Sequence, residues 1–316
     1  MSQIPFVTLP DPRYGEVVQV SPLIRRVIAE NPSKFTYHGT GTYIVGHGDV
    51  VVIDPGPLLD SHREALAAAL RGERVVAILV SHCHSDHSPL AGWLRDTTGA
   101  PTVAFGPHLV DPDWVDDDDP PEPDHQESQT AVKVEESLDI AFDPDVRVVD
   151  GDVAASGPGF TLRAVHTPGH TSNHLCFWLD EERALFTGDH IMGWSTTVIT
   201  PPDGDMRAYF ASLEKVRALS ADVLWPTHGA PVLEVQPFIE AFVCHRRDRE
   251  AQVLAAVRGG TVMIPDIVRQ LYIGVDDKLY QAAGRSVMSH LLKLADDGLV
   301  HFVGDHPGVK VAWLAI

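Results

Sequence analysis

Short apolar runs alternate with longer amphipathic stretches along the first two thirds of the chain. Runs such as "RVVAILV" (74–80) are rich in β-branched residues and are typical of strands buried on both faces. The stretches 61–71 and 207–219 repeat their apolar residues with helical spacing, and Ser61 is the candidate N-cap of the first. The segment 42–57 predicts two strands around the turn sequence "GHGD". Strand–helix alternation together with hairpins predicts an α/β fold with a mixed sheet covered by helices.

The pattern changes at two places along the chain. Between about 107 and 145 the chain is acidic, rich in proline and aperiodic, which predicts a long loop or lid; a solvated insertion is the simpler alternative. After about 240, three helical stretches precede two apolar runs that flank "GDHPG". This is the order of elements in a winged helix. We therefore predict a larger domain over 1–240 and a small winged-helix domain over 241–316.

The net charge and the cysteine content limit which cellular compartment and which binding partners are expected. The 316 residues carry a formal net charge of −20, which repels polyanions unless a local basic patch intervenes. The three cysteines show no paired spacing, which argues against a disulfide framework and favours a reducing cytosol. The apolar runs fall short of membrane-spanning length, and the first residues lack the features of a signal peptide. We expect a cytoplasmic protein with no membrane partner.

Four ionisable side chains follow the apolar run 74–80 at once: His82, His84, Asp86 and His87. Burying them unpaired would be costly, so a binding partner must compensate them. Alternate residues of an extended segment point the same way, so His82 and His84 can reach one point while Asp86 and His87 turn toward a second. Imidazole and carboxylate groups are good ligands for zinc and related divalent metals. The run therefore predicts a metal site.

Three further candidate ligands also follow apolar strands. His170 lies in "HTPGHT", Asp189 in "FTGDH" and His228 in "WPTHGAP", each near a glycine that permits close approach of the backbone. Seven side chains at four strand ends are enough to hold two metals. Cys83 points away from its two neighbouring histidines, so we interpret it as a small core residue.

These motifs resemble, in order, the five motifs of the metallo-β-lactamase-fold hydrolases, with Asp54 in "VVIDPGP" as the first. The resemblance implies an αββα sandwich as the fold of the larger domain. It also implies three groups of ligands: His82, His84 and His170 for the first metal, Asp86, His87 and His228 for the second, and Asp189 as a bridge. Asp54 would orient one of the ligands. The implied cofactors are two zinc ions per chain, with iron or manganese as alternatives.

The implied activity is hydrolysis by a hydroxide held between the two metals, because metal binding lowers the pKa of water toward about 7. Asp86 is the candidate to position this nucleophile and to carry a proton. An aspartate at 189 differs from the cysteine, or the missing bridge, of true β-lactamases of this fold. Thioesterases and nucleases keep the aspartate. A mononuclear-iron persulfide dioxygenase has similar ligands and stays an alternative.

The C-terminal part resembles the β-lactamase-like protein 2 family, through "GDHIMGWSTTVI", "YFASLEKV", "HRRDREAQVL" and the closing winged helix. That family implies cleavage of single-stranded RNA as an alternative. The broader expectation is a hydrolase of an ester, thioester, lactone or phosphodiester in a small or anionic substrate. A winged helix that reads nucleic acid is disfavoured, because Arg285 and Lys293 are balanced by Asp296 and Asp297. The domain is instead expected to pack near the pocket mouth, where it could shape the pocket or a homodimer.

Five residues outside the ligand set are candidates for supporting or substrate-binding roles. His174 is expected to stabilise the metal loop by a hydrogen bond, with substrate contact as the alternative. His190 could line the pocket or pack in the core, and Tyr209 could reach the pocket. Arg246 and Arg249 could form an anion-binding rim, although a solvated or salt-bridged helix face fits their pattern as well.

Overall fold

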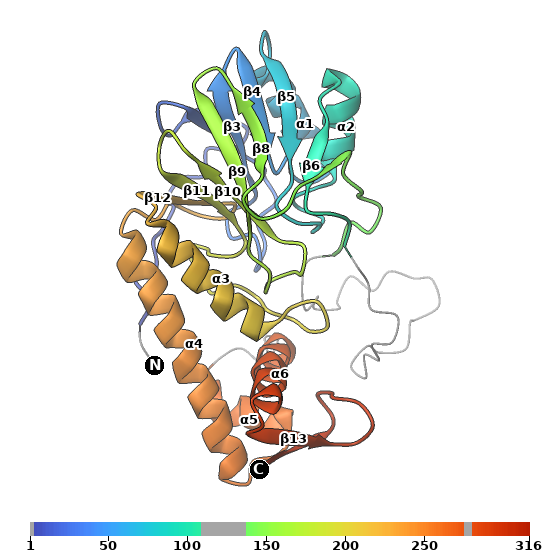
Figure 1. Ribbon diagram of the computed structural model, residues 1–316, viewed down its shortest axis with the longest axis vertical. Coiled ribbons are helices and arrows are strands. Elements are labelled where there is room, and N and C mark those ends of the chain that lie inside the picture. Colours follow the sequence, from blue (N-terminus) through green and yellow to red (C-terminus); the bar gives the residue numbers. More distant parts are fainter. Residues whose placement is uncertain (1–2, 109–136, 275–279) are drawn as a thin grey trace.

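The computed structural model describes residues 3–108, 137–274 and 280–316, and Figure 1 shows a larger lobe above a smaller one. Two stacked sheets with helices on their outer sides make up the larger lobe, and the C-terminal elements make up the smaller one. The predicted αββα sandwich with a C-terminal winged helix is therefore confirmed. The expected acidic lid lies largely outside the described residues. No described helix is long and apolar enough to cross a membrane.

The first sheet contains the N-terminal strands in their order along the chain. Its strands are β1 (Val18–Gln19), β2 (Ile24–Ile28), β3 (Gly41–His47), β4 (Asp49–Ile53), β5 (Arg74–Leu79), β6 (Thr102–Ala104) and β7 (Val146–Arg147). The first four pair antiparallel and the last four pair parallel, so the sheet is mixed, as predicted. Helix α1 (Asp60–Ala69) makes the crossover from β4 to β5, and α2 (Leu90–Thr98) makes the one from β5 to β6. Ser61 lies inside α1, which Leu59 caps, so the N-cap prediction was wrong.

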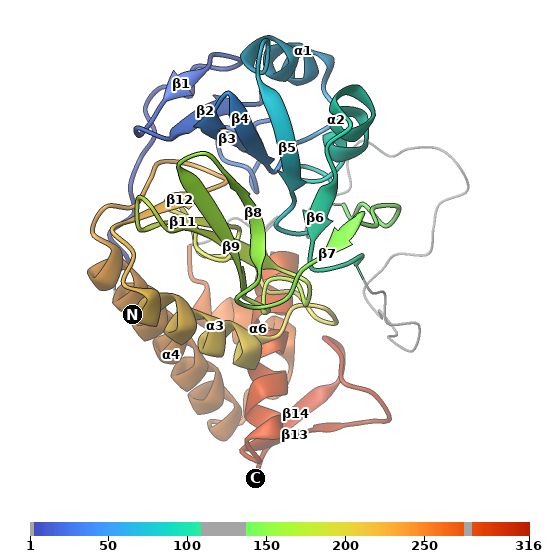
Figure 2. The same cartoon turned by 45° about the horizontal axis from the view of Figure 1, so that its top comes forward.

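The second sheet has the order β12-β11-β10-β9-β8 and faces the first. Its strands are β8 (Val153–Gly157), β9 (Phe160–His166), β10 (Leu175–Leu179), β11 (Ala184–Gly188) and β12 (Val223–Pro226). Strands β8 to β11 pair antiparallel, and α3 (Met206–Leu219) connects β11 to the parallel β12. Figure 2 shows this sheet with α3 on the side away from the first sheet.

The apolar strands fill two cores at once, because each buried strand sends alternate side chains to opposite faces. In β4, Val51 and Ile53 join the core between the sheets, whereas Val50 and Val52 pack with Leu66 of α1 on the outer face. Neither face of such a strand contacts solvent, so polar residues do not alternate with apolar ones along it. This explains the continuous apolar runs of the sequence.

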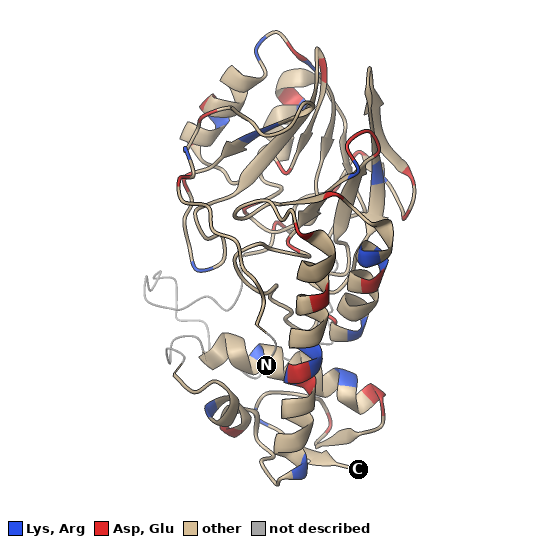
Figure 3. Ribbon diagram, turned by 90° about the vertical axis from the view of Figure 1, so that its left-hand side faces the viewer, with Lys and Arg blue, Asp and Glu red and all other residues tan. Residues whose placement is uncertain are grey.

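A single helix, α4 (Val235–Arg258), connects the two lobes. Its first half contributes Phe238 and Phe242 to the core beneath the second sheet, and its last turns contribute Val253 and Val257 to a separate C-terminal core. The predicted domain division at residue 240 falls inside this helix. Figure 3 shows acidic and basic residues interspersed along α3 and α4.

The C-terminal core contains the elements of the winged helix. They are α5 (Ile264–Leu271), α6 (Tyr280–Asp296), β13 (Val300–Val303) and β14 (Ala312–Ala315). The two strands form an antiparallel hairpin beside α6. Nη2 of Arg207 in α3 lies 2.6 Å from Oδ1 of Asp297, which directly follows α6. This ion pair is a contact between the winged-helix domain and the larger lobe. The expectation that this domain packs on the larger lobe agrees with that contact.

Candidate metal centre

The seven predicted ligands gather at one edge of the sandwich, on loops that follow four strands. The run 82–87 follows β5, His170 follows β9, Asp189 follows β11 and His228 follows β12. All seven side chains are buried or nearly so. Three overlapping groups of donors result, and within each group the donor atoms lie within 4.8 Å of one another.

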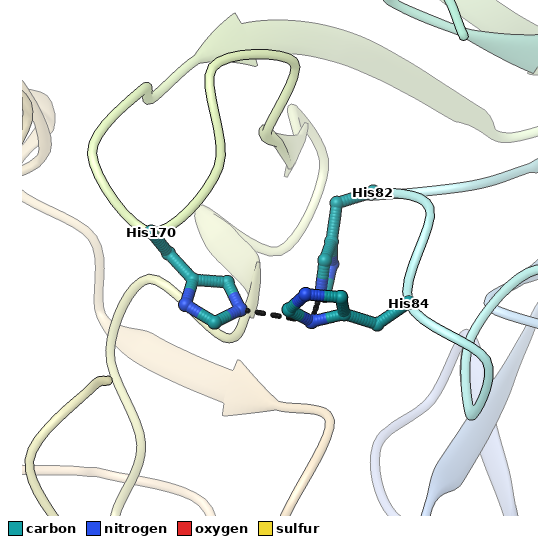
Figure 4. Close-up of side chains that lie close together, drawn as sticks. All are labelled: His82, His84 and His170. Atoms are coloured by element: carbon teal, nitrogen blue, oxygen red, sulfur yellow. Dashed lines mark hydrogen bonds between the residues drawn. The ribbon is translucent and has the colours of Figure 1, made fainter. Parts of the chain in front are cut away.

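The first group consists of His82, His84 and His170 (Figure 4). Nε2 of His82 approaches Nδ1 of His84 to 2.9 Å, and Nε2 of His170 approaches the same atom to 3.2 Å. Three ring nitrogens that face one another at such distances can serve as the donor set of one metal ion. The two histidines from one loop meet at one point, as their alternating spacing predicted.

The second group consists of Asp86, His87 and His228. Oδ2 of Asp86 lies 3.3 Å from Nε2 of His87 and 3.1 Å from Nε2 of His228. Asp189 lies between the two groups: its Oδ1 is 3.4 Å from His228, and its Oδ2 is 3.9 Å from His170. One carboxylate thus faces both donor sets, which is the arrangement of a bridging ligand.

Backbone carbonyls fix the orientation of two of the rings. Nδ1 of His170 donates to the carbonyl of Val198 at 2.6 Å, and Nδ1 of His228 donates to the carbonyl of Gly39 at 3.1 Å. A carbonyl can only accept, so the proton of each neutral ring lies on Nδ1 and the inward Nε2 is left with a free lone pair. Metal-binding histidines are typically held in this way.

Asp54 joins three of the loops beneath the centre. Its Oδ1 accepts from the Ser81 backbone N–H at 2.8 Å, and its Oδ2 accepts from the Thr227 hydroxyl and from Nδ1 of His87, both at 3.0 Å. The residue has a left-handed φ of 49°, and its side chain is almost fully buried. The expected orienting contact to a ligand is therefore present, on His87.

Burial and neighbouring charges shift the pKa values of the ligand groups in different directions. Burial lowers the pKa of His84 to about 3, which keeps this ring neutral. Burial also disfavours the charged form of Asp86, but His87 and His228 outweigh it and hold the pKa of the carboxyl well below its usual value. The carboxylates of Asp86 and Asp189 in turn raise the pKa of His87 against the effect of burial.

The residues present fit divalent cations. Nε2 of His87 and Oδ1 of both Asp86 and Asp189 are buried, yet they have no hydrogen-bond partner in the described part of the chain. Such groups are rarely left unsatisfied in a core. Nitrogen and oxygen donors of this kind, aimed inward from several loops, suit zinc and its neighbours in the first transition row.

His174 supports the loop of the bridging carboxylate. Its Nε2 accepts from the Asp189 backbone N–H at 3.2 Å, and its Nδ1 lies 2.9 Å from the Thr167 hydroxyl. Gly188 permits this contact, since a Cβ at that position would lie 2.6 Å from Nε2 of His174. The expected hydrogen-bonding role agrees with this geometry.

His190 and Tyr209 pack against each other behind the centre. Both are fully buried, their ring centroids are 5.0 Å apart, and the Tyr209 hydroxyl donates to the His190 carbonyl at 2.9 Å. Burial lowers the pKa of His190 to about 3, so its ring is neutral. Of the alternatives for His190, packing agrees with the structure. Tyr209 stabilises the turn at His190 by this hydrogen bond, and its side chain does not line an open pocket.

Arg246 and Arg249 are buried in the structure, with exposed fractions of 4% and 6%. The interpretation of these two residues as part of a solvated helix face was wrong. It fits their neighbour Arg247, which is exposed on the other side of α4. The sequence could not separate the three, because burial depends on what packs against the helix.

Sequence reasoning missed the hydroxyl groups that hold the carboxylates. The Thr40 hydroxyl donates to Oδ2 of Asp86 at 3.1 Å, and the Thr227 hydroxyl donates to Asp54. Thr227 stands next to the ligand His228, so its position was a usable signal. Thr40 lies 46 residues before Asp86, and nothing in its neighbourhood marks it.

We expect the substitution Cys83→Ala to leave metal content and activity within about twofold of wild type. The thiol is buried away from the donor groups, where it contacts the Gly106 carbonyl at 3.7 Å and accepts from Asn173 at 3.2 Å. Elemental analysis and a rate assay of the variant test this. Loss of metal from the variant would contradict the alternating arrangement of the 82–87 run.

Comparisons with known proteins agree with this geometry. A sequence model of the metallo-beta-lactamase superfamily matches residues 37–228, and one of the beta-lactamase associated winged helix domain matches 264–313. A lactamase-like protein of Aspergillus niger is 30% identical, over 96% of this chain and 90% of its own length. An atrochrysone carboxyl ACP thioesterase of Paecilomyces divaricatus is also 30% identical, over 96% of this chain and 89% of the relative.

Solved structures show the same fold. A beta-lactamase domain protein from Burkholderia ambifaria has a TM-score of 0.72 at 18% identity and covers 97% of this chain and 95% of its own. A metallo-beta-lactamase family protein from Thermus thermophilus has a TM-score of 0.69 at 20% identity, over 94% and 100% of the two chains. Both likenesses span the sandwich and the C-terminal domain together.

Proposed function

This chain belongs to the metallo-β-lactamase superfamily, and from that premise we propose that it hydrolyses thioesters with two divalent metal ions. The observation that carries the proposal is the pair of donor groups with Asp189 between them. The bond type is supported by relatives named as acyl-carrier thioesterases at 30% identity over nearly the whole chain. The assignment of the chain to this superfamily of hydrolases does not depend on which bond it cleaves.

Two bound metals would supply an activated water molecule and would neutralise charge that develops on the carbonyl oxygen. Asp86 is placed to orient that water. Its Oδ2 is held by the Thr40 hydroxyl and lies beside His228, whereas its Oδ1 has no hydrogen-bond partner among the described residues. Oδ1 can therefore accept the proton of the attacking water and return it to the departing thiolate as the C–S bond breaks.

A panel of substrates tests the bond type. It contains an ester, a thioester, a lactone, a phosphodiester and single-stranded RNA, each assayed with the zinc-loaded protein. We expect the highest kcat/KM for the thioester. Cleavage of RNA with no turnover of the thioester would replace this proposal by the endonuclease alternative.

We expect two transition-metal ions per chain, with zinc dominant, in protein purified without added metal. The seven donors form three overlapping groups of three, which is more than one ion needs. Elemental analysis against protein concentration gives the stoichiometry. One iron per chain would favour the persulfide dioxygenase alternative, because that chemistry needs one redox-active metal.

A further inference from the structure

A cavity of about 460 Å³ lies where four parts of the chain meet. Its walls come from residues 34–35, from the loop 194–199, from the middle of α4, and from Tyr272 and α6 of the winged-helix domain. Its volume is in the range of sites for small molecules, about 300–1,000 Å³. None of the functional roles described so far uses it.

The cavity shares one wall with the metal centre. The carbonyl of Val198 accepts from His170, and the hydroxyl of Thr197 donates to the carbonyl of Asp189 at 2.9 Å. His170 and Asp189 are also the most exposed of the seven candidate ligands, at 9% each. The loop that lines the cavity thus contacts two of the candidate ligands, which places the cavity next to the centre.

Two buried guanidinium groups line this cavity. Arg246 and Arg249 lie three residues apart, on one face of α4. Arg246 donates to the carbonyl of Thr197, and Arg249 donates to the carbonyl of Leu271 at 3.3 Å. Within the described ranges, their hydrogen bonds go to carbonyl groups, neither is paired with a carboxylate, and Nε of Arg246 has no hydrogen-bond partner.

A buried positive charge without a counter-ion is unfavourable, and two within one turn are more so. Aromatic rings partly compensate the positive charges. The guanidinium carbon of Arg246 lies 5.3 Å from the ring centroid of Tyr209, and that of Arg249 lies 4.1 Å from the ring centroid of Tyr272. Aromatic packing also fixes their position, so the fork of donors is preorganised for a carboxylate or a phosphate. Among the residues that the structure describes, the arrangement has no anion to pair with.

The remaining walls select an apolar ligand body. Phe35, Trp194, Ile199 and Ala283 contribute apolar surface. Trp194 is fixed by stacking on Tyr37, with centroids 4.9 Å apart and ring planes inclined by 13°. A flat aromatic or alicyclic group suits such a wall.

We propose that this cavity binds the acyl group of the thioester substrate, and that Arg246 and Arg249 bind a carboxylate carried by that group. The inference rests on the proposed thioesterase function. It assigns the substrate class as a thioester of an apolar acyl group with an acidic substituent. The phosphates of a coenzyme A or carrier-protein arm offer the same anionic chemistry, so the experiment has to separate the two sources.

Binding without turnover is the first test. The probes are 2-naphthoate and 2-naphthamide, which have nearly the same shape and differ in charge, and calorimetric titration of the full chain gives their Kd values. We expect wild type to bind the naphthoate at least tenfold more tightly. Arg249→Gln should reduce this preference below threefold, and Arg247→Gln, an exposed arginine two residues away, should keep it.

Equal binding of the two probes by wild type would overturn the proposal and needs no variant. An unchanged preference in Arg249→Gln would overturn it as well. A thermal melt shows whether the variant is folded; if it is not, Arg249→Lys, which keeps a positive charge, takes its place and should retain part of the preference.

Steady-state kinetics show whether Arg249 binds a carboxylate of the acyl group or a phosphate of the coenzyme A or carrier-protein arm. Acyl groups with a carboxylate or with the matching amide are each attached to N-acetylcysteamine and to coenzyme A. We expect Arg249→Gln to raise KM at least tenfold for both carboxylated thioesters and less than twofold for both amides. A rise that follows coenzyme A instead of the acyl carboxylate would overturn the assignment. Naphthoate binding that depends on Arg249, with no hydrolysis of any thioester, would refute the thioesterase proposal and leave the carboxylate site.

Discussion

Replacing Asp86 by asparagine should lower kcat/KM of the thioester by about 10³-fold, within the range of about 10²–10⁴ typical of a general acid–base residue. Asparagine keeps the shape of the side chain and can still accept from the Thr40 hydroxyl. It removes the negative charge that lies beside His87 and His228, and it removes the acceptor Oδ1 that has no other described partner. Steady-state kinetics and elemental analysis of the same preparation measure both effects.

The control for this experiment is Asp180→Asn, the same change on the surface, where Asp180 pairs with Arg163. It should leave both the rate and the metal content unchanged. Metal loss together with lost activity in Asp86→Asn would assign Asp86 mainly as a ligand, and lost activity with full metal content would assign it mainly to proton transfer. A rate within tenfold of wild type would show that another group positions the nucleophile.

The candidate metal centre could be predicted because its signals are local in the sequence. Each ligand directly follows an apolar strand, and strand ends of such a sandwich converge at one edge. The spacing of His82 and His84 even indicated which side chains meet, because a two-residue period fixes direction. Asp54, just after β4, was identified through the family resemblance of its motif "VVIDPGP".

The second layer of the site could not be predicted in the same way. Whether Arg246 faces solvent or a cavity depends on the loop 194–199 and on α6, which come from distant parts of the chain. A charge on a helix looks the same in the sequence in both cases. Thr40 reaches Asp86 only because the two loops lie side by side in the folded protein.

The boundary between the lobes illustrates a third limit. The change in sequence pattern near 240 is real, but α4 begins at Val235 and continues to Arg258. The apolar residues in the first half of α4 pack in the core of the larger lobe, and those in its last turns pack in the winged-helix core. Helical periodicity does not indicate which core a residue joins. The larger lobe therefore depends on residues beyond the predicted division.

Truncation of the chain after residue 240 should consequently abolish folding of the larger lobe. The truncation removes Phe242 and Val243, which are buried beneath the second sheet, and the hydrogen bond from Arg246 to the loop beside the metal centre. Loss of a buried phenylalanine side chain alone costs about 3–5 kcal/mol of unfolding free energy. That is a large part of the total of about 5–15 kcal/mol expected for a domain. Soluble yield and thermal melting of the truncated chain measure the effect.

The matched control is a chain that ends after Gly259, which retains the whole of α4 and loses only the winged-helix elements. It keeps Phe242, Val243 and Arg246 in place, although it exposes Val253 and Val257 on the last turns of the helix. We expect this longer chain to fold and to bind metal, with a lower melting temperature than the full chain, because the residues at the sheet contribute more than those that become exposed. If the chain ending at 240 melted like the one ending at 259, then the middle of α4 would not belong to the core of the larger lobe.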